Sequence, residues 1–217
     1  MADDALFDAS EEKTFLTGRP FREFADPAPL DKHGPATVLS MVNQKGGVGK
    51  TTSTINLGAC LAEQSRKVLL VDLDPQGALS AGLGVSHDEE QVTVYDLLFD
   101  NTTSIHGAIR HSNVSGLDLV PANIDLSAAE IQLVNEVGRE HTLARALRPV
   151  RNEYDIIIID CGPSLGLLTV NALACSQGVI IPMECEYFSL RGLALLTDTV
   201  EKVRDRINFD LDIVGIL

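Results

Sequence analysis

Short, mainly apolar segments recur along this chain and are separated by segments with helical periodicity. The clearest are residues 38–42, 67–72, 154–160 and 178–182. Strands that are apolar on both sides are typical of a parallel sheet whose two faces are covered by helices. The pattern therefore predicts an α/β fold with a mostly parallel central sheet, in which a ligand would bind at the carboxyl ends of the strands.

The other elements follow from the same periodicity. We expect helices at residues 51–63, 94–99, 105–110, 126–137, 142–147, 165–175 and 190–207, and strands at 117–120 and 211–217. The stretch from residue 77 to about 92 is rich in glycine and is expected to be irregular.

The chain divides into two unequal parts. Residues 1–36 combine an acidic start, several prolines and no sustained periodicity, so we expect a disordered or loosely packed tail. Residues 37–217 are expected to form one domain. The last residues read as an apolar strand without a polar tail, and we expect this domain to be truncated at its C-terminal end.

Composition excludes several classes of protein. A net charge of −14 argues against a generally basic surface for nucleic acid, although it leaves room for a local basic patch. No apolar run reaches the length of a transmembrane span, and the acidic start lacks a signal-peptide pattern. The four cysteines are scattered, which favours reduced thiols in a cytosolic core; they are Cys60, Cys161, Cys175 and Cys185.

A glycine-rich turn lies between the first predicted strand and the first predicted helix. It consists of Lys45, Gly46, Gly47, Val48, Gly49, Lys50, Thr51 and Thr52. Glycines allow successive backbone N–H groups to point at one anion, and the helix start adds its positive dipole end. Lys50 can contact β- and γ-phosphates, and the Thr51 hydroxyl can bind Mg²⁺. The turn is a variant phosphate loop, because Gln44 occupies the place of the first glycine.

Acidic residues follow two of the buried strands. Asp160 comes after four isoleucines, where an acid can orient a water on the Mg²⁺ bound by Thr51. Asp72 and Asp74 lie at the end of the second predicted strand, residues 67–72, and alternation along a strand predicts that both face the γ-phosphate, where one could orient the attacking water. For Asp72 a structural role is also open.

A second motif competes with this interpretation. Residues 162–166 match Gly-x-Ser-x-Gly, the nucleophile elbow of α/β-hydrolases, between a predicted strand and helix. Those enzymes place their catalytic histidine after the serine in the chain. All five histidines precede Ser164, so the chain as given cannot complete that triad in that order.

Taken together, the motifs resemble the ParA/Soj chromosome- and plasmid-partitioning ATPases, which belong with MinD to the deviant Walker A class of P-loop NTPases. The resemblance covers about residues 37–217 and is carried by residues 43–52, 71–77, 155–160 with 163–165, and 186–192. One departure is Gly162, where the family often has proline. The resemblance implies ATP and Mg²⁺ as cofactors and slow, Mg²⁺-dependent hydrolysis of ATP.

The resemblance also implies roles at the nucleotide. Lys45 matches the signature lysine that crosses an ATP-bound dimer to the partner's phosphates, and Lys50 matches the ordinary phosphate-loop lysine. Thr52 matches an α-phosphate contact, and Glu186 resembles a residue that reaches the sugar across the dimer. The remaining cofactor-binding residues are Gly46, Gly47, Val48 and Gly49.

At the metal and the attacking water, the resemblance assigns Thr51 as a Mg²⁺ ligand and Asp160 as an acid that acts through a water. Asp74 matches the aspartate that orients the hydrolytic water. Asp72 is expected to contact the groups that bind the metal, not the metal itself. Lys45, Lys50 and Asp74 are thus the candidate catalytic residues.

The implied cycle is that of a cytoplasmic switch that associates with the nucleoid when it holds ATP. It comprises a homodimer in the ATP state, non-specific DNA binding by that dimer, and hydrolysis stimulated by a ParB-like partner. The DNA-binding residues and much of the adenine pocket are expected beyond Leu217, and no membrane partner is expected.

Three alternatives remain open from the sequence. A MinD-like membrane-cycling ATPase would need a C-terminal amphipathic helix. A nitrogenase-reductase-like iron–sulfur protein would need paired cysteines at the dimer axis, for which Cys161 and Cys175 show no convincing pattern. A non-hydrolysing, nucleotide-gated adaptor of another chromosome-organising complex shares the same loop.

Overall fold

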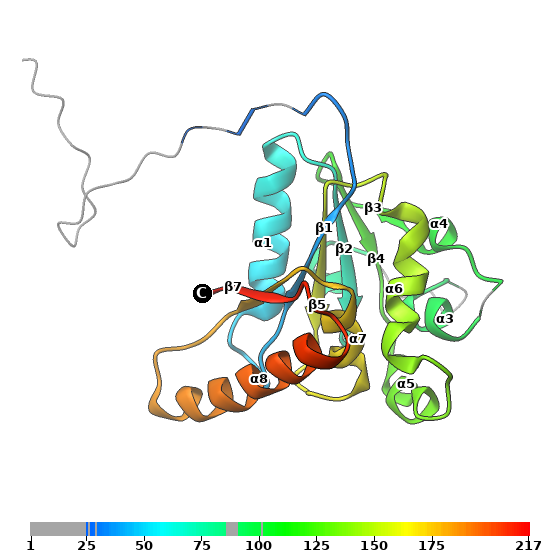
Figure 1. Cartoon of the computed structure of the whole chain (residues 1–217). Helices are drawn as coiled ribbons and strands as arrows, with labels where there is room; N and C mark the ends of the chain where they lie inside the picture. Colours follow the sequence, from blue (N-terminus) through cyan, green and yellow to red (C-terminus); the bar gives the residue numbers. More distant parts are fainter. Residues whose placement is uncertain (1–24, 26, 29, 86–90, 101) are drawn as a thin grey trace, which may run out of the picture.

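A seven-stranded sheet forms the centre of the molecule, in the order β3-β4-β2-β5-β1-β6-β7 (Figure 1). The computed structural model describes residues 25, 27–28, 30–85, 91–100 and 102–217. The strands are β1 (Thr37–Met41), β2 (Val68–Leu73), β3 (Arg110–His111), β4 (Leu117–Val120), β5 (Ile156–Cys161), β6 (Gly178–Ile181) and β7 (Asp212–Ile216). All neighbouring strands are parallel except β3 and β4. The predicted mostly parallel α/β fold is confirmed.

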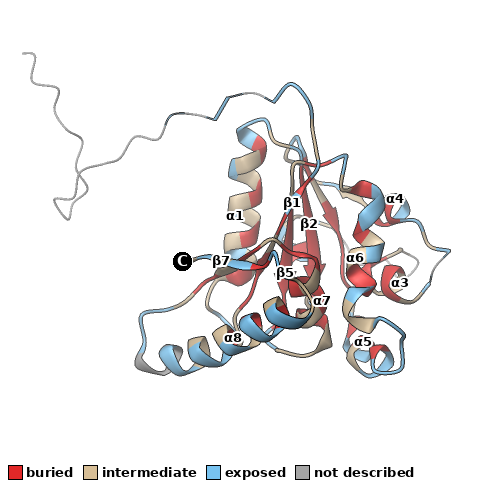
Figure 2. Ribbon diagram, in the orientation of Figure 1, coloured by how far each residue is buried: buried red, intermediate tan, exposed pale blue. Residues whose placement is uncertain are grey.

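Helices cover both faces of the sheet (Figures 1 and 2). Their bounds are α1 (Lys50–Glu63), α2 (Ala78–Gly82), α3 (Val94–Phe99), α4 (Ile105–Ala108), α5 (Leu126–Leu133), α6 (Thr142–Leu147), α7 (Leu167–Cys175) and α8 (Tyr187–Arg206), with single 3₁₀ turns η1 (Arg139–His141) and η2 (Arg148–Val150).

Alternation along the central strand β5 divides the interior into two cores. Ile157 and Ile159 pack into the larger core, under α3 to α8, whereas Ile158 packs into the smaller one, under α1 and α2. The close approach of α1 depends on Gly58, where an added Cβ would lie 2.9 Å from Leu70 Cδ2 and 3.1 Å from Leu117 Cδ1. Helices therefore cover β5 on both faces of the sheet, as its run of isoleucines predicts.

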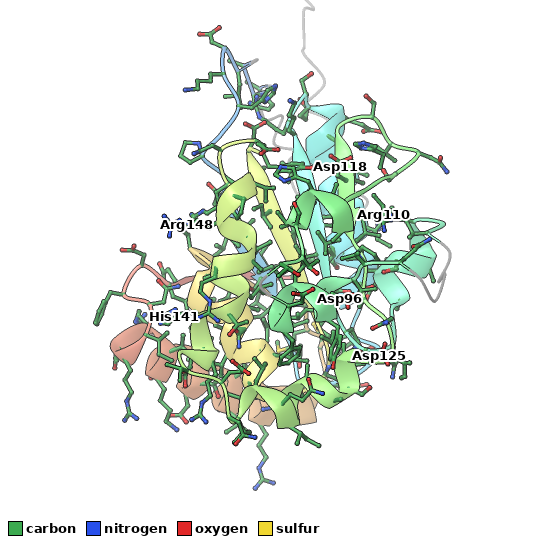
Figure 3. The ribbon with its side chains drawn as sticks, turned by 90° about the vertical axis from the view of Figure 1, so that its right-hand side faces the viewer. Asp96, Arg110, Asp118, Asp125, His141 and Arg148 are labelled. Carbon is green, nitrogen blue, oxygen red and sulfur yellow. The ribbon has the colours of Figure 1, made fainter. Side chains whose placement is uncertain are left out.

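The three largest departures from the predicted elements are a missed helix, a missed strand and a shorter α5. The stretch expected to be irregular contains α2, which begins after Gly77 at φ 61° and carries no apolar period long enough to recognise. The two-residue strand β3 pairs with β4 through Arg110 and His111, where the sequence predicts a helix up to residue 110; Figure 3 labels Arg110 of β3 and Asp118 of β4. Helix α5 ends at Leu133 instead of residue 137. Beyond it, the backbone N–H groups of Asn135 and Glu136 donate to carbonyl oxygens three residues back, as in a turn, instead of four residues back, as in an α-helix.

Most of the predicted tail, residues 1–24, 26 and 29, lies outside the described residues. The last residues of that segment are attached to the domain instead of loose. His33 Nδ1 lies 2.8 Å from Asp155 Oδ2, the Gly34 N–H donates to Asp155 Oδ1, and Ala36 is 3% exposed. The packed body thus begins a few residues before the predicted boundary.

Among the described residues, no helix combines the length and apolar character needed to cross a membrane.

Candidate functional site

The glycine-rich turn joins the end of β1 to the start of α1. Gly47 has φ 78° and Gly49 has φ 86°, which is the left-handed region that glycine adopts without strain. Gly49 is the N-cap of α1, so the first N–H groups of the helix open onto the turn. A Cβ added at Gly46 or Gly47 would meet nothing within 4 Å. The turn is therefore an open cradle of backbone N–H groups at a helix N-terminus, which suits an anion.

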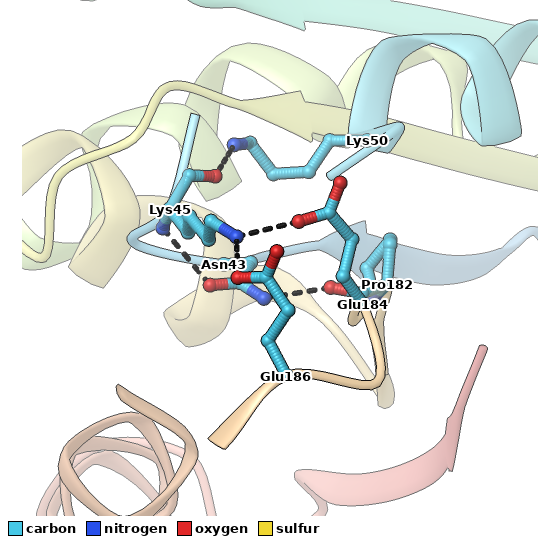
Figure 4. Close-up of polar contacts among 6 residues, drawn as sticks. All are labelled: Asn43, Lys45, Lys50, Pro182, Glu184 and Glu186. Carbon is cyan, nitrogen blue, oxygen red and sulfur yellow. Dashed lines mark hydrogen bonds and ion pairs between the residues drawn. The ribbon is translucent and has the colours of Figure 1, made fainter. Parts of the chain in front are cut away.

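Lys50 is the first residue of α1 and points back along this cradle. It is 7% exposed, and its Nζ donates to the carbonyl oxygen of Lys45 at 3.1 Å (Figure 4). Burial lowers the pKa of Lys50, and the carboxylates of Asp160 and Asp74 oppose that shift. A largely buried ammonium beside a cradle of N–H groups is arranged to receive a negatively charged ligand.

Thr51 and Asp160 meet beneath the turn. The Thr51 hydroxyl donates to Asp160 Oδ2 at 2.6 Å, and Thr54 Oγ1 lies 3.4 Å from Asp160 Oδ1. Asp160 is 1% exposed, and burial raises the pKa of this carboxyl to about 7. A threonine hydroxyl and a carboxylate are the hard oxygen groups that Mg²⁺ prefers. The pair therefore fits the predicted metal site, while Thr52 lies exposed on the same turn of α1.

Strand order explains how these groups converge. β5 lies between β2 and β1, and Asp160 is in register with both Asp72 and Met41. The acids that end β2 and β5 are therefore placed directly beside the loop that leaves β1. This is the carboxyl edge of a parallel sheet, where ligands bind in such folds.

Asp72 and Asp74 do not share one environment, which corrects the expectation that both face the phosphates. Asp72 is fully buried, and it accepts hydrogen bonds from Ser80 N–H at 3.0 Å, Ser80 Oγ at 2.7 Å and Asp74 N–H at 3.2 Å. Burial raises the pKa of Asp72, and its bonds with Ser80 oppose the shift. The carboxylate thus ties the first turn of α2 to the end of β2.

Asp74, one step beyond the strand, is partly exposed at the site. Its Oδ1 accepts from Gln76 N–H at 3.0 Å. A Cβ added at Gly162 would lie 3.5 Å from Asp74 Cγ, so the glycine that departs from the family pattern lies directly beside this acid. Asp74 also borders a cavity of about 430 Å³ whose other walls include Leu126 and Leu168. The carboxylate therefore has access to space that a water can enter.

Lys45 is engaged by two acids of the loop between β6 and α8. Its Nζ donates to Glu184 Oε2 at 2.5 Å and to Glu186 Oε2 at 2.6 Å (Figure 4). The hydrogen bond with Glu184, followed by that with Glu186, raises the pKa of Lys45. Glu186, expected at a nucleotide sugar, lies in this structure on Lys45 of its own chain.

Sequence reasoning missed three residues of this region. Glu184 contacts Lys45, Asn43 links the phosphate loop to Pro182, and Ser80 satisfies Asp72. Glu184 could have been found, because it follows the apolar run of β6 and so lies at the same edge as Asp160. Ser80 could not, because α2 was not predicted.

The competing motifs find no support in the geometry. Ser164 of the Gly-x-Ser-x-Gly segment donates to Glu130 Oε1 at 3.2 Å, and its described hydrogen-bond partner is thus a carboxylate instead of a histidine. Cys161 and Cys175 are buried, which removes them from a surface where two copies could share a cluster. In the part of the chain that the structure describes, no group of three or more His, Cys, Asp or Glu side chains could hold a metal ion.

Comparisons with known proteins find matches over most of the chain. The AAA domain family model (AAA_31) matches residues 36–213. An uncharacterized protein of Mycobacterium tuberculosis is 70% identical over 202 residues, covering 93% of this chain and 64% of the relative. The sporulation initiation inhibitor protein Soj of Bacillus subtilis is 51% identical over 180 residues, covering 83% of this chain and 71% of Soj. The chain thus spans less than two thirds of the length of the mycobacterial relative.

Solved structures show the same fold. The structure described as cobyrinic acid a,c-diamide synthase from Mycobacterium smegmatis, with bound ATP analog and magnesium, has a TM-score of 0.80 and 44% identity, covering 84% of this chain and 74% of that chain. A plasmid partition protein from Borrelia burgdorferi has a TM-score of 0.73 and 30% identity, covering 84% of this chain and 79% of that chain.

Proposed function

The chain belongs to the ParA/Soj family of partitioning ATPases, and on that premise we propose that it is an ATP-driven dimeric switch for segregating a chromosome or plasmid. The observation that carries the proposal is the convergence of the glycine cradle, Lys50, Thr51 and Asp160 at one edge of the sheet. The names Soj and ParA recur among relatives that are 44–52% identical, which favours partitioning over the synthase reaction.

ATP and Mg²⁺ are the proposed cofactors. The N–H groups of the cradle and Lys50 would hold the β- and γ-phosphates, and Thr52 would contact the α-phosphate. Thr51 would ligate Mg²⁺ directly, and Asp160 would act through a water. When bound, Mg²⁺ would neutralise the negative charge that develops on the phosphate oxygens. The burial of Asp160 supports this role, because a nearby cation offsets the cost of ionising a desolvated carboxyl.

The chain's own residues would promote hydrolysis by position and charge. Asp74 would orient the attacking water, since its carboxylate is partly exposed beside the end of β5. Lys45 would add positive charge at the phosphates of the partner copy, where the transition state spreads negative charge. Because the catalytic set would be complete only in a dimer, a single chain would hydrolyse ATP slowly.

The switch would have two partners besides a second copy. The protein would be cytoplasmic. Its ATP-bound dimer would bind DNA non-specifically and so associate with the nucleoid. A ParB-like protein would stimulate hydrolysis and release the dimer. The net charge of −14 supports a basic segment as the stimulating element, because complementary charge speeds encounter.

Size-exclusion chromatography and phosphate release test the proposal together. The full chain is chromatographed with ATP and with ADP, each with and without DNA, and phosphate release is followed with a ParB-like protein added. We expect the chain to elute as a dimer with ATP but not with ADP. We also expect the rate of phosphate release to rise when DNA and the partner are both present. Equal elution with ATP and ADP would contradict the dimeric switch, and binding without any phosphate release would favour the adaptor function.

A further inference from the structure

Lys45 is held inside its own chain by two carboxylates, which we call the acidic latch (Glu184 and Glu186). The two Nζ–Oε2 distances are 2.5 Å and 2.6 Å (Figure 4). An ammonium has three donors and no acceptor, so two carboxylates occupy most of its capacity. Contacts of this length between ionised groups are charge-assisted hydrogen bonds.

The backbone around the latch fixes its position. β1 and β6 are parallel neighbours, with Ser40 in register with Val179, so the loops that follow these strands leave the sheet side by side. The Asn43 side chain joins them: its Nδ2 donates to Pro182 O at 2.6 Å, and its Oδ1 accepts from Lys45 N–H at 3.0 Å. Glu184 thus stands two residues beyond a tethered point, and the latch is a product of the fold.

We propose that Glu184 and Glu186 compete with nucleotide phosphate for Lys45, so that dimer formation must first open the latch. The inference rests on the proposed function, because the competing ligand is the phosphate of a second copy. The Lys45 ammonium cannot keep both carboxylates and also approach phosphate oxygens, because the negatively charged carboxylates and phosphate would repel each other. Glu184 is therefore a positioning residue for Lys45 and restrains premature dimerisation.

The exposure of the latch suits a reversible device. The side chains of Lys45, Glu184 and Glu186 are 42%, 46% and 57% exposed, respectively. Exposed ion pairs are weakened by water and salt, so a phosphate in a desolvated dimer interface can displace them. Glu186 is the N-cap residue of α8, so the latch lies at the start of that helix.

The first test measures the latch without nucleotide. Lys45 of the full chain is acylated with an amine-reactive reagent, and the rate is followed by mass spectrometry, with the exposed Lys67 of the same protein as the internal reference. In Glu184→Gln, we expect Lys45 to react at least about twofold faster, because less negative charge holds its proton. Glu201→Gln, which removes an exposed acid on α8, should leave the rate unchanged. An equal rate in Glu184→Gln and the wild type would overturn the latch.

The second test measures competition. With a non-hydrolysable ATP analogue, sedimentation velocity should give a dimer dissociation constant several-fold lower for Glu184→Gln than for the wild type or Glu201→Gln. In a Lys45→Gln background, Glu184→Gln should have no further effect. A weaker dimer, or an undiminished effect in that background, would contradict the competition. If the wild type stays monomeric with the analogue, the proposed function and the competition fail together, while the acylation rate still decides whether the latch exists.

Discussion

The Thr51 hydroxyl donates a hydrogen bond of 2.6 Å to the buried carboxylate of Asp160. The two residues are far apart in sequence, and the register of β5 with β1 and β2 brings them together. The bond places the two oxygen groups that we propose for Mg²⁺ binding at the base of the glycine cradle. Asp160 is also buried, so its protonation affects the free energy of unfolding.

Stability should therefore depend on pH through Asp160. Its pKa is raised by burial to about 7 from the ordinary 3.8, so between these values the unfolded state releases a proton that the folded state keeps. The free energy of unfolding should fall as pH rises from about 4 to about 7, by a few kcal/mol at most, and Asp160→Asn should lose this decline. Chemical unfolding in EDTA, without nucleotide, measures the difference between the two proteins at each pH.

The exposed Asp205→Asn on α8 is the matched control, and its difference from the wild type should not vary with pH. A stability difference between Asp160→Asn and the wild type that stays constant from pH 4.5 to 7.5 would count against a buried, neutralised Asp160.

Ser80 should matter for the fold and not for the nucleotide. Ser80→Ala removes the hydroxyl that bonds Asp72 at 2.7 Å and leaves a buried carboxylate partly unsatisfied. We expect a loss of about 1–3 kcal/mol in the free energy of unfolding. Urea unfolding measures that loss, and the Mg²⁺ dependence of ATP binding should be unchanged. A shifted Mg²⁺ dependence with intact stability would instead place Asp72 near the metal.

Asp74→Ala should separate binding from turnover. Without the carboxylate that orients water, hydrolysis should fall about 100-fold or more. ATP should still bind, and the ATP dimer should persist for longer, as light scattering can follow. Asp205→Ala serves as the control. Undiminished phosphate release by Asp74→Ala would remove the assigned role.

Gly58→Ala should weaken the packing of α1 on the sheet. The new methyl group would press on Leu70 and Leu117, at 2.9 Å and 3.1 Å. We expect a loss of about 1–3 kcal/mol, because overpacking shifts a well-filled core. Gly107→Ala in α4, where an added Cβ meets nothing within 4 Å, should cost little. Equal thermal stability of Gly58→Ala and the wild type would contradict the tight contact.

The sequence predicted the sheet and the cradle because both depend on local patterns. Apolar runs such as residues 154–160 are long enough to read as buried strands, and Lys50 and Thr51 follow the glycines in a fixed order. The parallel pairing of β5 with β1 and β2 then brings Asp160 to the cradle.

What escaped prediction depends on contacts between distant segments. For Asp72 the sequence left a phosphate-facing and a structural role open, and the hydrogen bonds from Ser80, on an unpredicted helix, favour the structural one. The partners of Lys45 are remote in sequence, and only the neighbouring positions of β1 and β6 bring Glu184 to it. Alternation within one strand cannot reveal either relationship.

Isothermal titration calorimetry of the full chain with ATP and Mg²⁺ tests the central claim most directly. We predict saturable binding of one nucleotide per chain for the wild type and for Lys202→Ala, an exposed lysine on α8. Lys50→Ala, which removes the ammonium from the cradle, should bind no measurable ATP. Equal binding by Lys50→Ala and the wild type, or no heat from the wild type, would contradict the account.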